Sequence, residues 1–403
     1  MAEWISKTLG ELTSFISKGI PPKYVDEENE NTIRVLNQKC NRNFEISYNE
    51  SRIHNAAVKK VPENKLLHSG DVLINSTGTG TAGRVAQIFN IPVPTTVDGH
   101  MILLRPTKEI DPLYYGYVIK SYQKKIESLA EGSTGQTEIN RQRLQDEIYI
   151  TFPKDRALQK GIGTFLFQID EKIKNNSEIN NNLLEQALAI YKDWFCDYAL
   201  SDGILPENWK ITTIDAISSL VTRGIAPKYD DSSDQIVLNQ KCIRDHTIDI
   251  SLSRRHLPKK INEKWISKGD LLINSTGTGT LGRVAQVWFE ANNMTVDSHV
   301  TIVRPKDPIL QSYIGFWGLS HESEIEAQHT GSTGQTELPR DRVKAMELPL
   351  PDEDTLSKFN ELVIPMTSTV ISNQEENDRL SQLRDALLPK LMSGELDVSE
   401  IDL

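Results

Sequence analysis

Two glycine-rich segments have the residue spacing that most strongly suggests chemistry. Residues 78–83 (GTGTAG) and residues 277–282 (GTGTLG) both match the G-x-G-x-x-G pattern of dinucleotide-binding loops, and Asp98 and Asp297 follow at about the distance which that pattern expects. Such a loop must open a helix whose N-terminus faces a pyrophosphate. Here the first loop runs into a β-type stretch, residues 84–89 (RVAQIF), so the sequence predicts strand–loop–strand and disfavours a nucleotide.

A tight turn of glycine, threonine and serine also lets backbone amides and hydroxyls approach a phosphate or a base edge closely. DNA contact and a purely structural hairpin therefore both remain open for these loops. The polar candidates in and beside them are Ser76, Thr77, Thr79 and Arg84, with Ser275, Thr276, Thr278 and Arg283 in the second copy.

A second pair of segments reads GSTGQTE, at residues 132–138 and 331–337. Glutamine can pair with adenine through two hydrogen bonds and arginine with guanine, while serine and threonine suit phosphates. We expect DNA contact here. The alternatives are a solvated turn and a contact between a domain and a helix. The candidates are Thr134, Gln136, Thr137, Arg141 and Arg143, and Thr333, Gln335, Thr336, Arg340 and Arg342.

Three smaller motifs also recur and carry hydrogen-bond donors or positive charge. An NQK triplet follows a short apolar strand, a Lys-Tyr pair follows a Gly/Pro turn, and a Lys-Lys pair lies further on. Contact with DNA and plain surface decoration both remain open for them. The residues are Asn37, Gln38, Lys39, Lys23, Tyr24, Lys59 and Lys60, and Asn239, Gln240, Lys241, Lys228, Tyr229, Lys259 and Lys260.

Two residue types inside the repeated motifs favour structural roles. His100 and His299 recur in V-D-x-H without visible partners for a metal or a base role, so we expect each to make a structural hydrogen bond. Cys40 and Cys242 are expected to be small buried apolar residues. Three cysteines, without C-x-x-C or H-E-x-x-H, indicate neither a disulfide framework nor zinc.

The motifs recur because the chain is duplicated. Residues 69–87 and 268–286 differ at only three of nineteen positions, and VLNQKC begins at both Val35 and Val237. A period of about 200 residues indicates duplicated domains and not a solenoid. The first part of each half has short β-type runs punctuated by Gly, Pro and Asn, which predicts an α+β domain with mixed or antiparallel strands.

A helical segment closes each half. Seam positions alternate in steps of four and three, and the second helix repeats the pattern of the first 197 residues later, which predicts a coiled coil. The seam asparagines lie near the helix midpoints and do not decide parallel from antiparallel; two unrelated surface helices are the alternative. Pro365 is expected to kink the second helix, and Pro389 to mark its frayed end. The first seam runs through Ile162, Leu166, Ile169, Ile173, Asn176, Asn180, Leu183, Ala187, Ile190 and Trp194.

Charge neither supports nor excludes nucleic acid. The 403 residues carry a net charge of −11, but residues 353–403 alone hold 4 basic and 11 acidic side chains. The two large segments are near neutral, which permits a basic face. No run approaches the ~18 apolar residues of a membrane span. The first residues lack the regions of a signal peptide, so we expect a cytoplasmic protein.

Taken together, these features resemble the specificity subunits of Type I restriction–modification enzymes. Two non-identical halves, each followed by a long helix, are similar to that family's architecture. LRDALLPKLMSGEL at residues 383–396 resembles the family's C-terminal helix ending, and KDWF at residues 192–195 its central counterpart. The GDVLIN…GTAGRVA and GSTGQTE segments resemble its recognition-domain motifs, so the resemblance covers essentially the whole chain.

The resemblance implies a fold and a division of labour. Two target-recognition domains, at residues 1–154 and 201–352, would be separated by two antiparallel helices, at residues 155–200 and 353–403, with pseudo-two-fold symmetry. Each domain would read one half of a bipartite site in double-stranded DNA, and the helices would dock two modification subunits. Those partners would bind S-adenosylmethionine and methylate adenine, and restriction (motor–nuclease) subunits would supply ATP- and Mg-dependent cleavage.

This chain is then expected to be non-catalytic, without a cofactor or metal of its own. It lacks an adenine-methylation motif of the N/D-P-P-Y type and a G-x-x-x-x-G-K-[ST] loop for ATP. A duplicated scaffold that binds protein or glycan, a nucleotide-dependent enzyme, and a specificity subunit of a Type IIB-like or methylation-only system remain alternatives.

Two expectations go beyond the family. The presumed contact loops of the two halves are nearly identical, so we predict similar half-sites, inverted if a two-fold axis relates the domains. Helices of ~40 residues span about 60 Å, which predicts a spacer of several unread base pairs with a fixed length.

Overall fold

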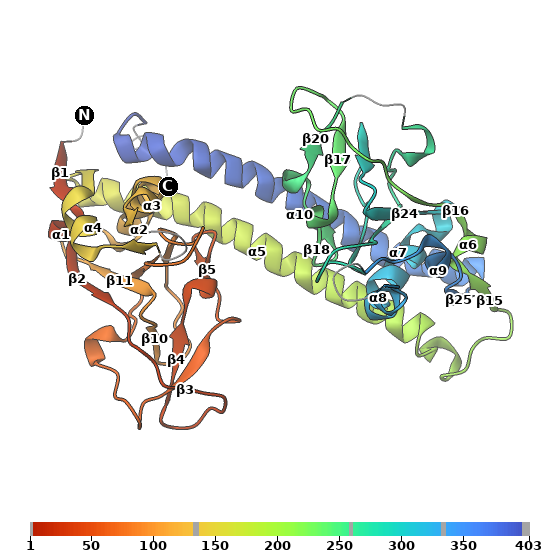
Figure 1. Ribbon diagram of the computed structural model, residues 1–403, viewed down its shortest axis with the longest axis horizontal. Coiled ribbons are helices and arrows are strands. Elements are labelled where there is room, and N and C mark those ends of the chain that lie inside the picture. The colour runs from red at the N-terminus through yellow and green to blue at the C-terminus, as the bar shows by residue number, and fades with distance from the viewer. Residues whose placement is uncertain (1–2, 132–136, 258–260, 332–335, 397–403) are drawn as a thin grey trace. The chain divides into compact units, whose positions relative to one another are not determined.

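The structure is a computed structural model that describes residues 3–131, 137–257, 261–331 and 336–396 (Figure 1). The chain folds into two compact units. Unit 1 comprises Met1–Lys174 and Asn377–Leu403, and unit 2 comprises Asn175–Glu376. Each unit contains one α+β domain and about half of each long helix, α5 (Arg156–Phe195) and α10 (Glu353–Ser393).

Two four-stranded sheets form the domain of unit 1. The first is antiparallel, in the order β2 (Thr13–Lys18), β11 (Met101–Pro106), β8 (Val72–Asn75), β9 (Val85–Gln87). The second has the order β10 (Thr95–Val97), β4 (Thr32–Leu36), β7 (Arg52–Asn55), β3 (Tyr24–Val25). Only the β10–β4 pair of the second sheet is parallel, so the predicted mixed α+β domain is confirmed.

Short elements complete this domain. They are β1 (Trp4–Thr8) paired with β14 (Tyr149–Pro153), β5 (Asn41–Arg42) with β6 (Glu45–Ile46), β12 (Ala130–Glu131) with β13 (Glu138–Ile139), and the helices α1 (Leu9–Leu12), α2 (Pro112–Ser121), α3 (Gln123–Ser128) and α4 (Arg141–Glu147).

The domain of unit 2 repeats this plan. Its antiparallel sheet has the order β16 (Ser218–Arg223), β24 (Val300–Pro305), β21 (Leu271–Asn274), β22 (Val284–Gln286), and its second sheet the order β20 (Arg254–Arg255), β17 (Ile236–Leu238), β23 (Met294–Val296). The other elements are β15 (Lys210–Thr213) paired with β25 (Glu347–Leu350), β18 (Ile243–Arg244) with β19 (Thr247–Ile248), and α6 (Ile214–Ile217), α7 (Gln311–Ser320), α8 (Glu322–Ala327) and α9 (Arg340–Lys344).

A buried glutamine joins sheet and helix in both domains. The side-chain amide of Gln87 donates to the carbonyl oxygens of Gly70 and Pro112, at 2.9 and 2.7 Å. A Cβ at Gly116 would lie 1.8 Å from the Gln87 amide oxygen, so only glycine allows α2 to approach β9 this closely. Gln286 and Gly315 repeat the arrangement in unit 2, which explains why the glycine lies within a helix at both places.

Within each unit the two long helices run antiparallel. In unit 1 the Arg384 guanidinium lies 2.6 Å from the Asp170 carboxylate. In unit 2 the Asn373 amide donates to the Asn180 side-chain oxygen at 2.8 Å, and the Asn180 amide donates to the Val370 carbonyl at 3.3 Å. Early residues of α5 thus meet late residues of α10. The asparagine positions alone did not decide between parallel and antiparallel helices. The contacts show the antiparallel arrangement, as the family resemblance implied.

The predicted seam of α5 is confirmed at most positions. Its buried members are Ile162, Leu166, Ile169, Asn176, Asn180 and Ala187, and its half-buried members are Ile173, Leu183, Ile190 and Trp194. Trp194 still contacts α10, since its ring centroid lies 6.2 Å from that of Phe359. The prediction missed Leu184, Tyr191 and Phe195, which are buried as well. Buried residues along α5 are spaced four apart more often than in a heptad, because a straight helix has 3.6 residues per turn and not 3.5. Helix α10 also runs unbroken through Pro365 and Pro389, so Pro389 does not mark its end.

The domains pack on their helix segments through different chemistry. In unit 2 the contact is an aromatic cluster in which Phe195 lies 5.0 Å from both Tyr313 and Phe359 between ring centroids. In unit 1 the Tyr117 hydroxyl donates to Asp170 at 2.6 Å, and Lys120 lies 4.0 Å from the same carboxylate. The position of Lys120 in α2 corresponds to Leu319 in α7.

Candidate nucleic-acid interface

The glycine-rich loops connect antiparallel strands in both units. β8 pairs with β9, and β21 with β22, so the predicted strand–loop–strand structure is confirmed. All six motif glycines have positive φ, from +71° at Gly80 to +106° at Gly78, a region that L side chains rarely adopt. A Cβ at Gly83 would also lie 2.5 Å from the Glu127 side chain of α3. The glycines therefore shape a hairpin and do not open a helix toward a pyrophosphate.

A glutamine side chain clamps each hairpin. The Gln38 amide donates to Thr77 Oγ1 at 3.0 Å, and its oxygen accepts from Thr81 Oγ1 at 3.2 Å. In unit 2 the Gln240 amide donates to Thr276 Oγ1 at 2.6 Å. Because both ends of the Gln38 amide face the hairpin, this side chain positions the loop.

The repeated histidines contact the same threonines as the glutamines. His100 Nδ1 lies 2.9 Å from Thr77 Oγ1, and His299 Nδ1 lies 2.8 Å from Thr276 Oγ1. The predicted structural hydrogen bond is therefore present in both copies. With these threonines held, the exposed polar side chains at the hairpin tips are Thr79 and Thr278.

The asparagines of the NQK triplets cap short 3-10 helices. The Asn37 side-chain oxygen accepts from the Lys39 backbone N–H at 2.9 Å, and its amide donates to the Glu50 carbonyl at 2.6 Å. Asn239 makes the corresponding bonds to Lys241 and Leu252. A base contact by either asparagine would have to break these bonds, so capping is the role that the geometry gives them. Cys40 and Cys242 beside them are buried, as predicted.

Two candidates are corrected by their burial. Ser76 and Ser275 are both 0% exposed, and the Ser275 hydroxyl lies 2.6 Å from Thr301 Oγ1. They directly follow the buried strands β8 and β21 and are not available to a ligand. The sequence could not distinguish them from the threonines that come next, because burial ends between the serine and the threonine and not at the strand end.

The remaining candidates vary in exposure and in partners. Arg84 closes its own hairpin by donating to the Gly80 carbonyl at 3.1 Å, and Arg143 is ion-paired with Glu131 and Glu147. Thr137, Thr336 and Arg283 are half-buried, and the exposed side chains are those of Lys23, Lys39, Lys59, Lys60, Arg141, Lys228, Tyr229, Lys241, Arg340 and Arg342. Thr134, Gln136, Lys259, Lys260, Thr333 and Gln335 lie outside the described residues.

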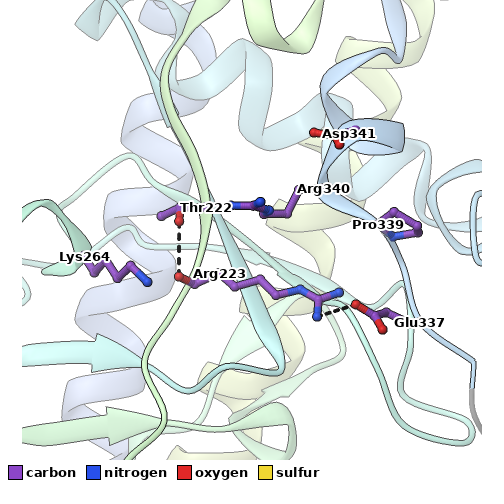
Figure 2. Close-up of a pocket in the computed structure, with 7 residues that line it drawn as sticks. All are labelled: Thr222, Arg223, Lys264, Glu337, Pro339, Arg340 and Asp341. Carbon is purple, nitrogen blue, oxygen red and sulfur yellow. Dashed lines mark hydrogen bonds and ion pairs between the residues drawn. The ribbon is translucent and has the colours of Figure 1, made fainter.

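Unit 2 has a cationic pocket of about 440 Å³ beside its hairpin (Figure 2). The Arg223 guanidinium donates to the Leu338 carbonyl at 2.9 Å and lies 2.6 Å from the Glu337 carboxylate, while Lys264 Nζ donates to the Gly224 carbonyl at 3.0 Å. Figure 2 shows the side chains of Lys264 and Arg340 approaching Thr222 and Arg223 from opposite sides. The lining residues are Thr222, Arg223, Lys264, Glu337, Pro339, Arg340 and Asp341.

Unit 1 gathers the corresponding charges. Lys18 is ion-paired with Glu138, and Lys65 Nζ donates to the backbone carbonyl of Lys18 at 2.8 Å. Burial lowers the pKa of both lysines, and the positive charge of Arg141 lowers the pKa of each further. Arg141 and Arg340 were the cations of these clusters that the motifs singled out. Lys18 was missed because it corresponds to Arg223, so the repeat at this position is one of charge and not of identity.

Each unit also stacks an arginine on a tyrosine. The Arg52 guanidinium lies 3.5 Å from the Tyr24 ring centroid, and Arg254 lies 3.4 Å from that of Tyr229. Such stacks hold an exposed cation in a defined position. The sequence indicated the tyrosines but not the arginines, although an R-x-H triplet at residues 52–54 and 254–256 marks the repeat.

A family model matches the first part of the chain. Residues 1–185 match the Type I restriction modification DNA specificity domain. This stretch contains the hairpin, its glutamine and histidine supports, and the cationic residues of unit 1. The first 185 residues are thus similar to a DNA specificity domain, and the motifs of this stretch recur in the second half of the chain.

Two relatives match nearly the whole chain. It is 24% identical over 422 residues to the Type I restriction enzyme MjaIX specificity subunit of Methanocaldococcus jannaschii, covering 99% of this chain and 95% of that protein. It is 22% identical over 473 residues to the HindI specificity subunit of Haemophilus influenzae, covering 98% and 100%. The crystal structure of a Type-I restriction-modification system S subunit from M. genitalium has the same fold, with 16% identity, a TM-score of 0.62 and coverage of 97% and 96%. Over nearly its whole length the chain is therefore similar to specificity subunits of Type I restriction enzymes.

Two absences within the described residues complete the picture of the site. No helix in these ranges combines the length and the apolar character needed to cross a membrane. Among the same residues, no group of three or more histidine, cysteine, aspartate or glutamate side chains is arranged to hold a metal ion.

Proposed function

We propose that each α+β domain reads one half of a bipartite site in double-stranded DNA, and that the two half-sites are similar and inverted. The chain itself would catalyse nothing. Partner subunits would bind S-adenosylmethionine and methylate adenine, and restriction subunits would add ATP- and Mg-dependent cleavage.

The observation that carries this proposal is the repetition of one polar surface in two separate domains. Each presents a threonine at the tip of a clamped hairpin, an arginine at the start of a short helix and an arginine stacked on a tyrosine. Base edges are read by such side chains, and phosphates are bound by such cations. Two domains that present the same groups in the same places are expected to read the same bases.

The long helices are the proposed docking site for modification subunits. Several apolar side chains on them are exposed, including Leu362 and Ile364 in unit 2 and Leu383 in unit 1, at 43%, 50% and 46%. Single exposed apolar side chains are common on protein surfaces, so the main support for docking is the similarity to specificity subunits of Type I restriction enzymes. The same helices would fix the length of the unread spacer between the half-sites.

The first test is the salt dependence of DNA binding by the full chain. We expect the anisotropy of a labelled 40-base-pair duplex of random sequence to report binding that weakens steeply as KCl rises, because cations that bind phosphates displace counterions. A scaffold for protein or glycan predicts no such binding.

A double variant and a single-site control locate the interaction. Replacing both stacked arginines (Arg52→Ala and Arg254→Ala) should weaken binding and lower the slope of log K against log salt by about one for each phosphate that the variant no longer binds. Lys154→Ala is the control, since Lys154 is exposed and paired with Glu3 at the end of the β1–β14 ribbon. Equal slopes of log K against log salt for the variant and the control would show that the stacked arginines do not bind phosphates.

A further inference from the structure

Each cationic cluster contains one carboxylate that faces its central cation. Glu337 lies 2.6 Å from the Arg223 guanidinium in unit 2, and Glu138 is ion-paired with Lys18 in unit 1. Both carboxylate side chains are more than half exposed, at 55% and 52%, whereas their cations are at 24% and 32%. The cations are therefore held by the protein, and the carboxylates reach in from solvent.

The backbone that carries these glutamates is fixed independently of the ion pairs. The Ile139 N–H donates to the Ser76 carbonyl and the Leu338 N–H to the Ser275 carbonyl, both at 2.8 Å. Glu138 and Glu337 also form β-bridges to Thr77 and Thr276 at the start of the hairpins. Each carboxylate can therefore swing out of its cluster while the strand and the hairpin stay in place.

The cations left behind would suit a tetrahedral anion. In unit 2 three cationic residues, Arg223, Lys264 and Arg340, line one pocket with the Thr222 hydroxyl, and Asp341 is the one carboxylate of the lining besides Glu337. Within the part of the chain that the structure describes, Nε of Arg223 is buried and has no hydrogen-bond partner. A guanidinium beside an ammonium and a hydroxyl is a common arrangement for binding phosphate.

We propose that Glu138 and Glu337 occupy the phosphate-binding position of each domain in the DNA-free chain, and that a backbone phosphate displaces them when the chain docks on duplex DNA. The inference rests on the proposed function, because it assigns this surface to DNA. It adds a means of regulation: the carboxylates lower sequence-independent affinity, so stable docking requires contacts that only the target bases supply. The same carboxylate–cation pair stands at the corresponding place of both domains, although the cation is lysine in one and arginine in the other.

If the ion pairs are purely structural, removing the carboxylates should change DNA affinity in the opposite direction. If the pairs only hold the hairpin surface in shape, Glu138→Gln and Glu337→Gln loosen that surface and weaken DNA binding. If the carboxylates compete with phosphate, the same isosteric changes strengthen it.

The experiment compares two full-length double variants, each of which loses two negative charges, but at different places. One is Glu138→Gln with Glu337→Gln. The control is Glu109→Gln with Asp215→Asn, because these carboxylates pair with Lys7 at 2.5 Å and Lys344 at 3.1 Å outside the cationic clusters. The probe is the labelled random-sequence duplex at 100 mM KCl, and thermal melting checks that both variants fold.

We expect the glutamine pair to bind about ten-fold more tightly than the wild type, and the control less than about three-fold, the general effect of added net positive charge. In an Arg223→Gln background, Glu337→Gln should have a smaller effect than in the wild type. Salt-sensitive binding by the wild type, with equal or weaker binding by the glutamine pair than by the control, overturns the inference and leaves the proposed function standing. If no protein in the set binds the duplex, the proposed function and the inference fall together.

Discussion

At the residue scale, a buried lysine distinguishes unit 1 from unit 2. Lys120 is 14% exposed, and its ammonium lies 4.2 Å from the Phe44 ring centroid and 4.0 Å from the Asp170 carboxylate. Burial lowers its pKa to about 8, with Arg384 acting in the same direction and Asp170, Asp385 and Glu45 opposing it. The domain therefore contains a cation where its duplicate has Leu319.

Lys120→Leu, which copies unit 2, is expected to stabilise the protein at pH 7 by roughly 2 kcal/mol, since each unit of pKa depression is worth about 1.4 kcal/mol and the favourable cation–ring interaction is removed. A lysine with a lowered pKa in the folded state contributes stability above its unfolded pKa, near 10.5, and loses it as the pH falls toward 8. The gain from Lys120→Leu should therefore shrink as the pH rises through that window. Urea denaturation at several pH values measures it. Lys154→Leu, at an exposed position, is the control, and a gain that stays constant with pH would contradict a lowered pKa at Lys120.

The buried ion pairs of the central sheets give a second residue-scale prediction. Arg105 binds Asp71 through two hydrogen bonds of 2.8 Å, Arg304 binds Asp270 in the same way, and both aspartates are 1% exposed. Asp71→Ala leaves a half-buried guanidinium without its carboxylate, which typically costs about 3–5 kcal/mol. Glu109→Ala removes an exposed partner of Lys7 and should cost less than about 1 kcal/mol. If the two variants lose similar amounts of unfolding free energy, the buried pair stabilises the protein no more than the exposed one does.

At the element scale, the antiparallel helices meet through asparagines near their midpoints. Asn180 accepts from the Asn373 amide and donates to the Val370 carbonyl, and it is 7% exposed. An amide that satisfies a partner amide and a backbone carbonyl favours one alignment of the two helices over its neighbours.

Asn180→Leu should destabilise the chain by about 1–3 kcal/mol, because the half-buried Asn373 amide loses its acceptor. Adding Asn373→Leu should recover most of the loss, since two apolar side chains can pack where one orphaned amide cannot. Urea denaturation of the single and double variants tests this, with Asn182→Leu on the exposed face of α5 as the control. A double variant that is less stable than either single variant would contradict it.

Elements were more predictable from the sequence than the site. The duplication and the helices follow from periodicity and from direct comparison of the halves. The burial of Leu184, Tyr191 and Phe195 does not, because a heptad and a 3.6-residue period diverge only after several turns. In the site, Ser76 and Asn37 look as available as Thr79 in the sequence, yet one is buried and the other caps a helix. Lys18 and Lys65 join Arg141 only through the fold, since they lie on separate segments.

At the whole-molecule scale, the proposed function makes the chain a DNA reader with two similar domains. If the helices fix the spacer, changing its length by two or three base pairs should abolish methylation, because such a change rotates one half-site around the duplex relative to the other. Methylation of synthetic duplexes by the chain with its modification subunit measures this. Equal methylation across spacer lengths would show that the helices do not set the distance.

The central claim is that the two domains read similar, inverted half-sites, and genome-wide mapping of methylated adenines tests it most directly. The chain is co-expressed with its modification subunit, and modified bases are located by single-molecule sequencing. We predict one bipartite motif whose two halves match when one is read on the opposite strand. A motif with two unrelated halves would contradict the claim, since domains with the same hairpins and cations would then be reading different bases.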